Sequence, residues 1–156
     1  MSQESVPTPQ IYVDADACPV KDEIYKVGER HGLRITYVSN AFMRLPEDAL
    51  VTRVVVPDGP DVADDWIADH TRHHDIVITN DIPLAGRCIE RGAIVLGTSG
   101  REFTEATIGQ ALASRALNQH LREIGEIGGS NPVFTPKARS DFLQAMESAC
   151  RRARRG

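Results

Sequence analysis

The sequence predicts an α/β fold, in which a mainly parallel sheet of about five strands is flanked by helices and followed by a helical C-terminal extension. Short apolar or β-branched runs alternate with helical patterns between residues 11 and 97. Parallel neighbours in a sheet need such crossover helices. After residue 104 the pattern is helical only. The 156 residues, 41% of them hydrophobic, are enough for one globular domain with an ordinary core.

Each predicted strand is an apolar run, and the predicted helices begin or end at residues that favour helix ends. Proline suits the first helical position because its missing N–H costs no hydrogen bond there, and glycine favours a helix stop. The predicted strands are 11–13, 33–39, 51–56, 75–79 and 93–97. The predicted helices are 19–32, 62–74, 83–92, 104–125 and 136–152.

The domain organisation follows from these elements. We expect residues 1–10 to be a flexible N-terminus and residues 11–156 to form a single domain. Within it, 11–100 would be the α/β core and 101–156 the helical extension.

The N-terminal segment, the lengths of the apolar runs and the spacing of the cysteines limit which class of protein this sequence can encode. The start, MSQESVPTPQ, has no basic and apolar leader, and no apolar run approaches the ~20 residues needed to span a bilayer. Cys18, Cys88 and Cys150 lie too far apart to indicate a disulfide framework or a zinc site. We therefore expect a cytoplasmic protein without a membrane partner. The oligomeric state stays open, a homo-oligomer included.

Acidic and basic residues are divided along the chain. Residues 1–99 hold 9 basic against 16 acidic residues, and residues 100–156 hold 9 against 6. A negative surface repels nucleic acid unless a cation intervenes, whereas a basic flank can contact phosphates. Two interpretations of the terminal RRARRG stay open. It is either a solvated helix end whose arginines suit the macrodipole, which we favour, or a binding tail.

Five aspartates stand at the ends of predicted strands or at the helix starts beyond them. Asp14 and Asp16 follow the first strand, Asp61 and Asp64 open the helix after the third, and Asp81 follows the fourth. In an open parallel sheet, ligands bind beyond the carboxyl ends of the strands. These acids are therefore expected to meet at one edge.

Helix capping is the competing explanation, because Asp is a favoured N-cap. A proline at the first helical position makes the preceding residue the cap, which predicts Cys18 and Ile82 as caps. Asp14, Asp16 and Asp81 would then lie upstream of the caps, where capping explains them poorly.

For the other two acids, capping and ligation both stay open. Asp61 would make a good N-cap, and Asp64 suits the positive end of the dipole in the first helical turn.

Converging carboxylates need protonation or a cation. Two unit charges ~4 Å apart repel by about 1 to 4 kcal/mol at the effective dielectric constants of water and of a protein surface. Oxygen ligands without His or Cys favour Mg²⁺ or Mn²⁺ over zinc. Such an ion can activate water and stabilise charge on a phosphate, which is a common arrangement for cutting a phosphodiester.

Four short segments stand out as motifs, namely DADACP (14–19), GPDVAD (59–64), DIVITNDIPLA (75–85) and RGAIVLG (91–97). They resemble motifs of the YaiI/YqxD family of uncharacterised bacterial proteins. The resemblance covers about residues 10 to 150. That family is grouped with PIN-like and NYN nuclease domains, so the resemblance implies a PIN-like sheet whose acids bind Mg²⁺ or Mn²⁺ and cleave RNA.

The resemblance also implies roles for the acids by motif. Asp14, Asp61, Asp64 and Asp81 would be the metal ligands, and Asp14, Asp16 and Asp81 the catalytic residues, with Asp16 assisting or orienting water. The expected protein is a nuclease that hydrolyses phosphodiesters in nucleic acid, RNA before DNA.

One segment departs from the family pattern. The family usually has Asn-Pro-Arg-Gly after the last strand, whereas this chain has Gly-Thr-Ser-Gly-Arg at 97–101. Thr98, Ser99 and backbone amides could substitute in holding phosphate. The candidate substrate-binding residues are Lys21, Arg87, Thr98, Ser99 and Arg101.

Two rival interpretations stay open. In a haloacid-dehalogenase-like phosphatase, Asp14 would be the nucleophile and Asp16 the acid/base. The order of the motifs argues against it, because VLGTSG follows Asp81. A non-catalytic PIN-like binding or regulatory module would keep the acids without the activity. Outside the acids, we expect Trp66 in the core and Cys18 in packing or capping.

Overall fold

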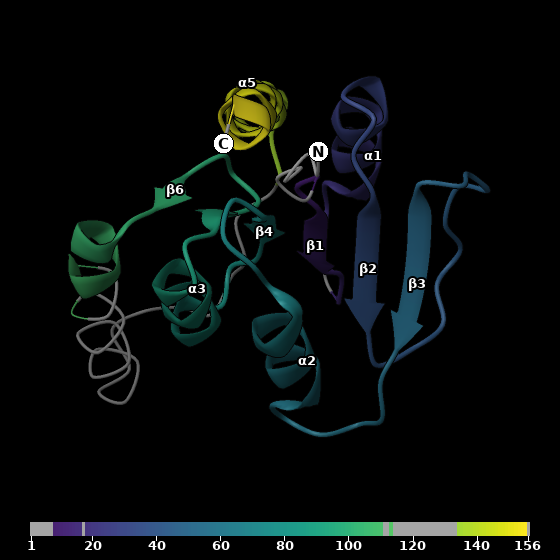
Figure 1. The fold of residues 1–156 in the computed structure, drawn as a ribbon, viewed down its shortest axis with the longest axis horizontal. Helices are drawn as coiled ribbons and strands as arrows, with labels where there is room; N and C mark the ends of the chain where they lie inside the picture. The colour runs from purple at the N-terminus through teal and green to yellow at the C-terminus, as the bar shows by residue number, and fades with distance from the viewer. Residues whose placement is uncertain (1–7, 17, 111–112, 114–133, 156) are drawn as a thin grey trace, which may run out of the picture.

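A computed structural model describes residues 8–16, 18–110, 113 and 134–155. It confirms the predicted α/β fold, with one six-stranded sheet in the order β3-β2-β1-β4-β5-β6 (Figure 1). The first five strands are mutually parallel, and β6 is antiparallel to β5. The strands are β1 (Ile11–Asp14), β2 (Ile35–Ser39), β3 (Val51–Val55), β4 (Ile76–Ile78), β5 (Ile94–Leu96) and β6 (Glu102–Phe103).

Helices cover both faces of the sheet. Helices α1 (Lys21–Arg30) and α5 (Pro136–Arg155) lie on one side, and α2 (Val62–His70) and α3 (Ile82–Glu90) on the other (Figure 1). Neighbouring residues of β1 show the alternation, since Ile11 and Val13 pack in the α1/α5 core and Tyr12 in the α2/α3 core. Because both faces are covered, the strands are almost entirely apolar, as parallel strands usually are.

The predicted element boundaries hold to within a few residues, with one strand added. The predicted helix 62–74 ends at His70, because Thr71 is extended and its hydroxyl donates to the Ile67 carbonyl over 2.6 Å. Strand β6 was not predicted, since its two residues carry no periodic pattern. A sixth, antiparallel strand therefore closes the sheet beyond β5.

The start of α1 corrects a predicted cap. Pro19 was expected at the first helical position with Cys18 as the cap, yet α1 begins at Lys21 with Val20 as its N-cap. The amide of Ile24 donates to the Val20 carbonyl, which fixes the first helical turn there. Cys18 is a buried packing residue, and burial raises the pKa of its thiol.

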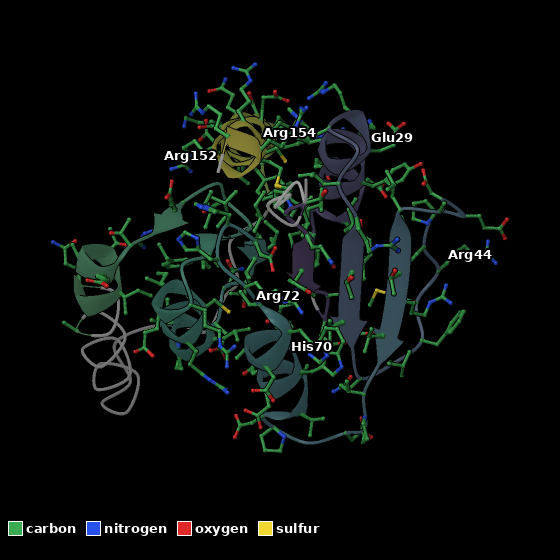
Figure 2. The ribbon with its side chains drawn as sticks, in the orientation of Figure 1. Glu29, Arg44, His70, Arg72, Arg152 and Arg154 are labelled. Atoms are coloured by element: carbon green, nitrogen blue, oxygen red, sulfur yellow. The ribbon has the colours of Figure 1, made fainter. Side chains whose placement is uncertain are left out.

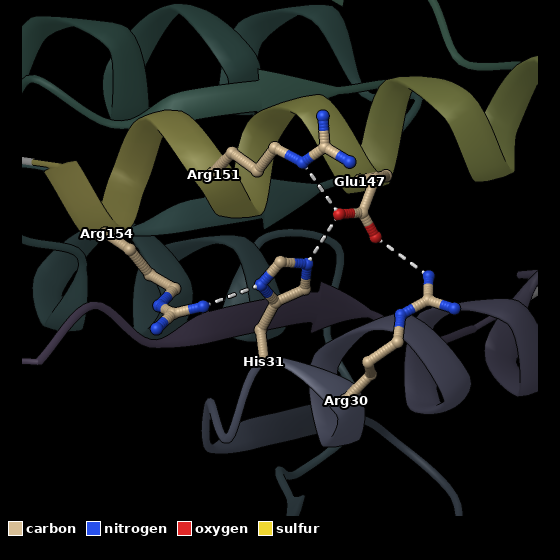
Figure 3. Close-up of polar contacts among 5 residues, drawn as sticks. All are labelled: Arg30, His31, Glu147, Arg151 and Arg154. Atoms are coloured by element: carbon tan, nitrogen blue, oxygen red, sulfur yellow. Dashed lines mark hydrogen bonds and ion pairs between the residues drawn. The ribbon is translucent and has the colours of Figure 1, made fainter.

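The C-terminal helix is locked onto α1 by a polar cluster around Glu147 (Figure 3). Its carboxylate accepts hydrogen bonds from Arg30 (2.8 Å), His31 (2.9 Å) and Arg151 (2.9 Å). Arg154 donates to the other ring nitrogen of His31 over 3.0 Å. One ring nitrogen of His31 thus contacts the Glu147 carboxylate and the other contacts the Arg154 guanidinium, so the C-cap of α1 is held to α5 at two points.

The terminal arginines are thus more than a solvated helix end. Arg152 forms a two-bond contact with Glu102 of β6 (2.8 and 3.2 Å), and Arg151 and Arg154 join the Glu147 cluster. Figure 2 shows Arg152 and Arg154 on α5. Arg152 and Arg154 hold α5 to the sheet and to α1, and the favoured interpretation of RRARRG as a helix end is confirmed, because α5 runs to Arg155 with arginines in its last turn.

Of the predicted helix 104–125, residues 105–110 are helical, and most of the remainder lies outside the described residues. Among the described helices, none is long and apolar enough to cross a membrane.

Candidate functional site

The strand order places a topological switch point between β1 and β4. The chain runs from β1 through β2 to β3 on one side, and then returns to β4 and β5 on the other side of β1. Ligands of open α/β sheets bind in the crevice outside the carboxyl ends of the strands at such a point. Asp14 is the last residue of β1, and Thr79 to Asp81 follow β4 directly. The switch point is therefore lined by two of the predicted acids.

A buried hydroxyl ties these two acids together. Thr79 is 1% exposed, and its hydroxyl donates to Asp14 Oδ2 over 2.8 Å. The hydroxyl oxygen of Thr79 in turn accepts the backbone N–H of Asp81 over 3.0 Å. Since the register pairs Val13 with Ile78, Asp14 and Thr79 are the next residues along neighbouring strands. Thr79 thus fixes the position of one acid's side chain and of the other acid's backbone.

Asp81 does cap its helix, which corrects the sequence prediction. It is the N-cap of α3, and its Oδ1 accepts the N–H of Leu84 over 2.9 Å. Pro83 occupies the second helical position instead of the first. Capping uses one carboxylate oxygen, and a carboxylate has a second oxygen with lone pairs for another ligand. Asp81 can therefore cap and ligate at once.

Asp61 and Asp64 behave in the opposite way to Asp81. Asp61 stands at the N-cap position of α2, but its side chain makes no capping hydrogen bond. Asp64 lies in the first turn and is half-buried. Helix capping therefore accounts for Asp61 less well than the sequence suggested.

The acids interact through their charges. Burial, followed by the negative charges of Asp81, Asp14 and Asp61, raises the pKa of Asp64 to about 6, with Arg87 opposing. Burial also raises the pKa of Asp14, against the Thr79 hydrogen bond, and the charges of Asp81 and of Asp16 add to the rise. Carboxylates from three separate chain segments thus contribute, after burial, to the raised pKa of Asp64.

Asp16 lies at the margin of this group. It is exposed on the loop after β1, and its Oδ2 accepts the N–H of Asn40 over 3.1 Å. The bond joins the loops that follow β1 and β2. Asp16 is therefore near Asp14 electrostatically, but it is held toward β2.

The chemistry of these side chains suits a hard divalent cation, whereas their spacing is open. Among the described residues, no three His, Cys, Asp or Glu side chains lie close enough together to hold a metal ion directly. Mg²⁺ usually binds through one or two carboxylates and keeps several waters. Asp14 and Asp81, linked through Thr79, would suffice for that mode of binding.

Two predicted substrate-binding residues have intramolecular partners. The ammonium of Lys21 donates to the Cys18 carbonyl over 3.0 Å. Arg87 of α3 pairs with Asp65 of α2 over 2.8 Å. Each would have to leave its partner, or share it, to contact a phosphate.

The other predicted substrate-binding residues lie on the loop between β5 and β6. Thr98 exchanges two hydrogen bonds with the side chain of Asn80, at 2.8 and 2.9 Å. The guanidinium of Arg101 lies 5.8 Å from the centre of the Phe103 ring. Ser99 is the exposed residue between them. The loop is thus joined to the segment that carries Asp81, and it presents hydroxyls at the carboxyl edge.

Thr79 and Asn80 are the residues that the sequence prediction missed. Both belong to the DIVITND segment, where only the aspartate was given a role. A signal was available, because a polar pair directly follows a wholly apolar strand.

Comparison with known proteins shows the family. The family described as "Uncharacterized BCR, YaiI/YqxD family" matches residues 12–152. A "UPF0178 protein" of Agrobacterium fabrum is 54% identical over 147 residues, which is 94% of this chain and 96% of that protein. Another, of Parvibaculum lavamentivorans, is 56% identical over 146 residues, covering 94% and 96%. No solved structure shows a significant match. The chain belongs to the YaiI/YqxD family.

Proposed function

We propose that this protein is a divalent-metal-dependent nuclease, which hydrolyses phosphodiester bonds in nucleic acid and prefers RNA to DNA. The observation that supports it most is the pair Asp14 and Asp81, which the Thr79 hydroxyl joins at the switch point of the sheet. The pKa of Asp64 is raised by burial and by the charges of Asp81, Asp14 and Asp61, which agrees with it. Unpartnered carboxylates destabilise one another, and a cation removes that repulsion. The resemblance to PIN-like nucleases points the same way.

In this proposal Asp14 and Asp81 hold the Mg²⁺ or Mn²⁺ ion, and Asp61 and Asp64 bind it through water. The bound ion supplies an activated water and neutralises charge on the phosphate. Asp16 orients the attacking water from the β2 side. Thr79 keeps the Asp14 carboxylate turned toward the switch point.

In this proposal, groups on the β5–β6 loop contact a phosphate of the substrate. Thr98 and Ser99 offer hydroxyls at the same edge, and Arg101 offers a cation. The preference for RNA follows from the family resemblance.

Metal binding is tested by thermal unfolding of the metal-free protein with and without Mn²⁺ or Mg²⁺. We expect the ion to raise the Tm of the wild type, because it binds the folded state only. Asp14→Asn should lose that metal-dependent rise. The control is Asp69→Asn, which removes an exposed acid farther along α2. We compare the metal-dependent rise in Tm between the variants and not the Tm values themselves. Removing the Asp14 charge relieves repulsion between the acids and so changes the Tm even without metal.

Activity is tested by cleavage of unstructured RNA and single-stranded DNA with Mn²⁺. We expect the wild type and Glu90→Gln, which removes an exposed acid at the end of α3, to cut RNA faster than DNA, and Asp14→Asn and Asp81→Asn to be inactive. Cleavage that persists in both variants would place the activity elsewhere. If neither metal changes the Tm of the wild type, the result would instead favour a non-catalytic module.

A further inference from the structure

A groove of about 660 Å³ lies away from the acids, at the amino ends of the strands. Its walls come from the end of α2, from the loop that leads to β4 and from the first residues of β1, β2 and β3. Residues of the proposed metal site do not line it. The proposed metal site therefore does not explain why these residues line the groove.

An aromatic stack forms one wall of the groove. The rings of Tyr12 and Trp66 meet edge to face with centroids 6.0 Å apart, and Trp66 stacks on His70 at 3.7 Å and 14°. Exposure rises along the stack, because Tyr12 is 7% exposed, Trp66 is half-buried and His70 is exposed. The predicted core residue Trp66 is thus the middle of a stack whose outer end is open to solvent.

Hydrogen bonds fix this stack before any ligand arrives. The ring Nδ1 of His70 donates to the Trp66 carbonyl over 2.7 Å, and the Tyr12 hydroxyl donates to the His70 carbonyl over 3.3 Å. In the neutral ring, Nε2 of His70 is therefore an acceptor. A rigid aromatic surface binds a flat ligand at a low entropic cost.

Two exposed arginines line the same groove. Arg34 donates to the Thr52 hydroxyl over 3.3 Å, which holds it over the strands. Arg72 follows α2, and the loop that carries it is pinned because Asp75 accepts the N–H groups of Gln10 (2.9 Å) and Arg72 (2.8 Å). Figure 2 shows Arg72 and His70 beside α2.

The acids of the groove leave these arginines available to an anion. Asp75 is 4% exposed, and both of its oxygens accept backbone N–H groups. Asp69 is exposed at the rim and opposes the two guanidinium groups. His73 and His74 line the groove too and would add positive charge on protonation.

We propose that this groove binds one unpaired nucleotide of a nucleic-acid strand, with its base stacked on His70 and its phosphate between Arg34 and Arg72. Aromatic platforms next to basic side chains are the usual means of holding single strands without sequence preference. That the nucleotide belongs to the substrate strand rests on the nuclease proposal. Asp64 and His70 are six residues apart on α2, or roughly 9 Å along its axis, so a few nucleotides would connect the two sites.

The test uses Trp66, which is the only tryptophan of the chain. The full-length protein is titrated with a short unstructured RNA in EDTA, so that neither metal nor cleavage is needed. We expect saturable quenching of the tryptophan fluorescence, and little quenching by an abasic oligomer of the same length. Equal quenching by the abasic oligomer, or none by the RNA, would overturn the proposal.

Substitutions locate the binding, measured by anisotropy of a labelled RNA. His70→Ala, which removes the exposed ring, should weaken binding about tenfold, and Arg34→Gln and Arg72→Gln should each weaken it several-fold. The control is Arg44→Gln, an exposed arginine near β3 (Figure 2). Losses as large in the control as in the groove variants would contradict the assignment.

The groove proposal and the nuclease proposal can fail independently of each other. RNA binding that survives Asp14→Asn, with no cleavage by the wild type or by any variant, would support the groove and refute the nuclease. Cleavage that depends on Asp14, with binding unchanged in all three groove variants, would refute the groove and leave the nuclease standing.

Discussion

The hydroxyl of Thr79 donates to the carboxylate of Asp14 over 2.8 Å, across 65 positions of sequence. The bond joins the carboxyl ends of the two neighbouring strands at which the chain reverses its direction across the sheet. The same hydroxyl accepts the N–H of Asp81. One buried threonine therefore organises the centre of the candidate site.

Thr79→Val keeps the shape of this side chain and removes its hydrogen bonds. We expect the free energy of unfolding to fall by about 1–2 kcal/mol, because a buried carboxylate loses a donor and a backbone N–H loses its acceptor. Urea unfolding measures it. Thr79→Ser retains the hydroxyl and should lose much less. Equal losses for valine and serine would mean that the methyl packing matters and the hydroxyl bridge does not.

Asp64 makes the stability of the metal-free protein depend on pH. Its pKa is about 6 in the folded protein and 3.8 as an unperturbed group, so the folded state binds the proton more tightly between those values. The free energy of unfolding should therefore fall as the pH rises from about 4 to about 6. Above that window, the ionised carboxylate destabilises the fold.

Asp64→Asn should remove this dependence. At about pH 7.5 in EDTA we expect it to stabilise the protein by about 1 kcal/mol, since two pKa units correspond to about 3 kcal/mol before solvent screening. Near pH 3 it should change little, because Asp64 is then largely protonated in both states. The measurement is urea unfolding at the two pH values, with Asp69→Asn as control. A variant that is less stable at the higher pH would show that the Asp64 charge is compensated.

The sequence predicted the sheet better than the caps. Hydrophobic periodicity and turn residues located the five parallel strands, because burial on both faces leaves a continuous apolar run. Pro83 misled the assignment of the cap. The first-turn N–H groups have no helical partner, so proline fits the second position as well as the first. Asp81 therefore caps α3, although the prolines predicted Ile82.

The sequence predicted only part of the candidate site. Strand ends with acids indicated which segments would meet. The hydroxyl bridge was hidden, because it depends on the register between β1 and β4, which no local pattern encodes. The aromatic stack was hidden for a related reason. Helical spacing assigns Trp66 to a buried face, but it does not show that a groove beside the end of α2 leaves the ring half-buried.

The unusual loop at 97–101 is held by helix α5. Gly100 has φ +89°, and a Cβ there would lie 2.7 Å from the Asp141 carbonyl oxygen. Gly32 has φ +69° with open space around it. Gly32→Ala should therefore cost only the backbone strain, about 1 kcal/mol. Gly100→Ala should cost a further 1–2 kcal/mol or so, because the backbone of α5 cannot yield as a flexible side chain would.

The comparison of the two alanine variants by urea unfolding isolates the contact between loop and helix. If they lose the same free energy, the loop moves away from α5 without cost. Its hydroxyls would then not be fixed at the carboxyl edge by this contact.

Glu147 fastens α5 to α1 by accepting hydrogen bonds from Arg30 and His31, and Arg151 donates to it from within α5 (Figure 3). Burial alone would raise its pKa, but the bonds from His31, Arg30 and Arg151 outweigh burial and lower it. Its contribution to stability is therefore complete above the unfolded pKa of about 4.5 and is lost as the pH falls through the folded value. Glu147→Gln should lower the free energy of unfolding by about 1 kcal/mol at neutral pH, because the pairs are partly exposed. Glu29→Gln removes an exposed charge of α1 as the control, and a loss that persists unchanged at low pH would show that the Glu147 charge is not what holds the helix.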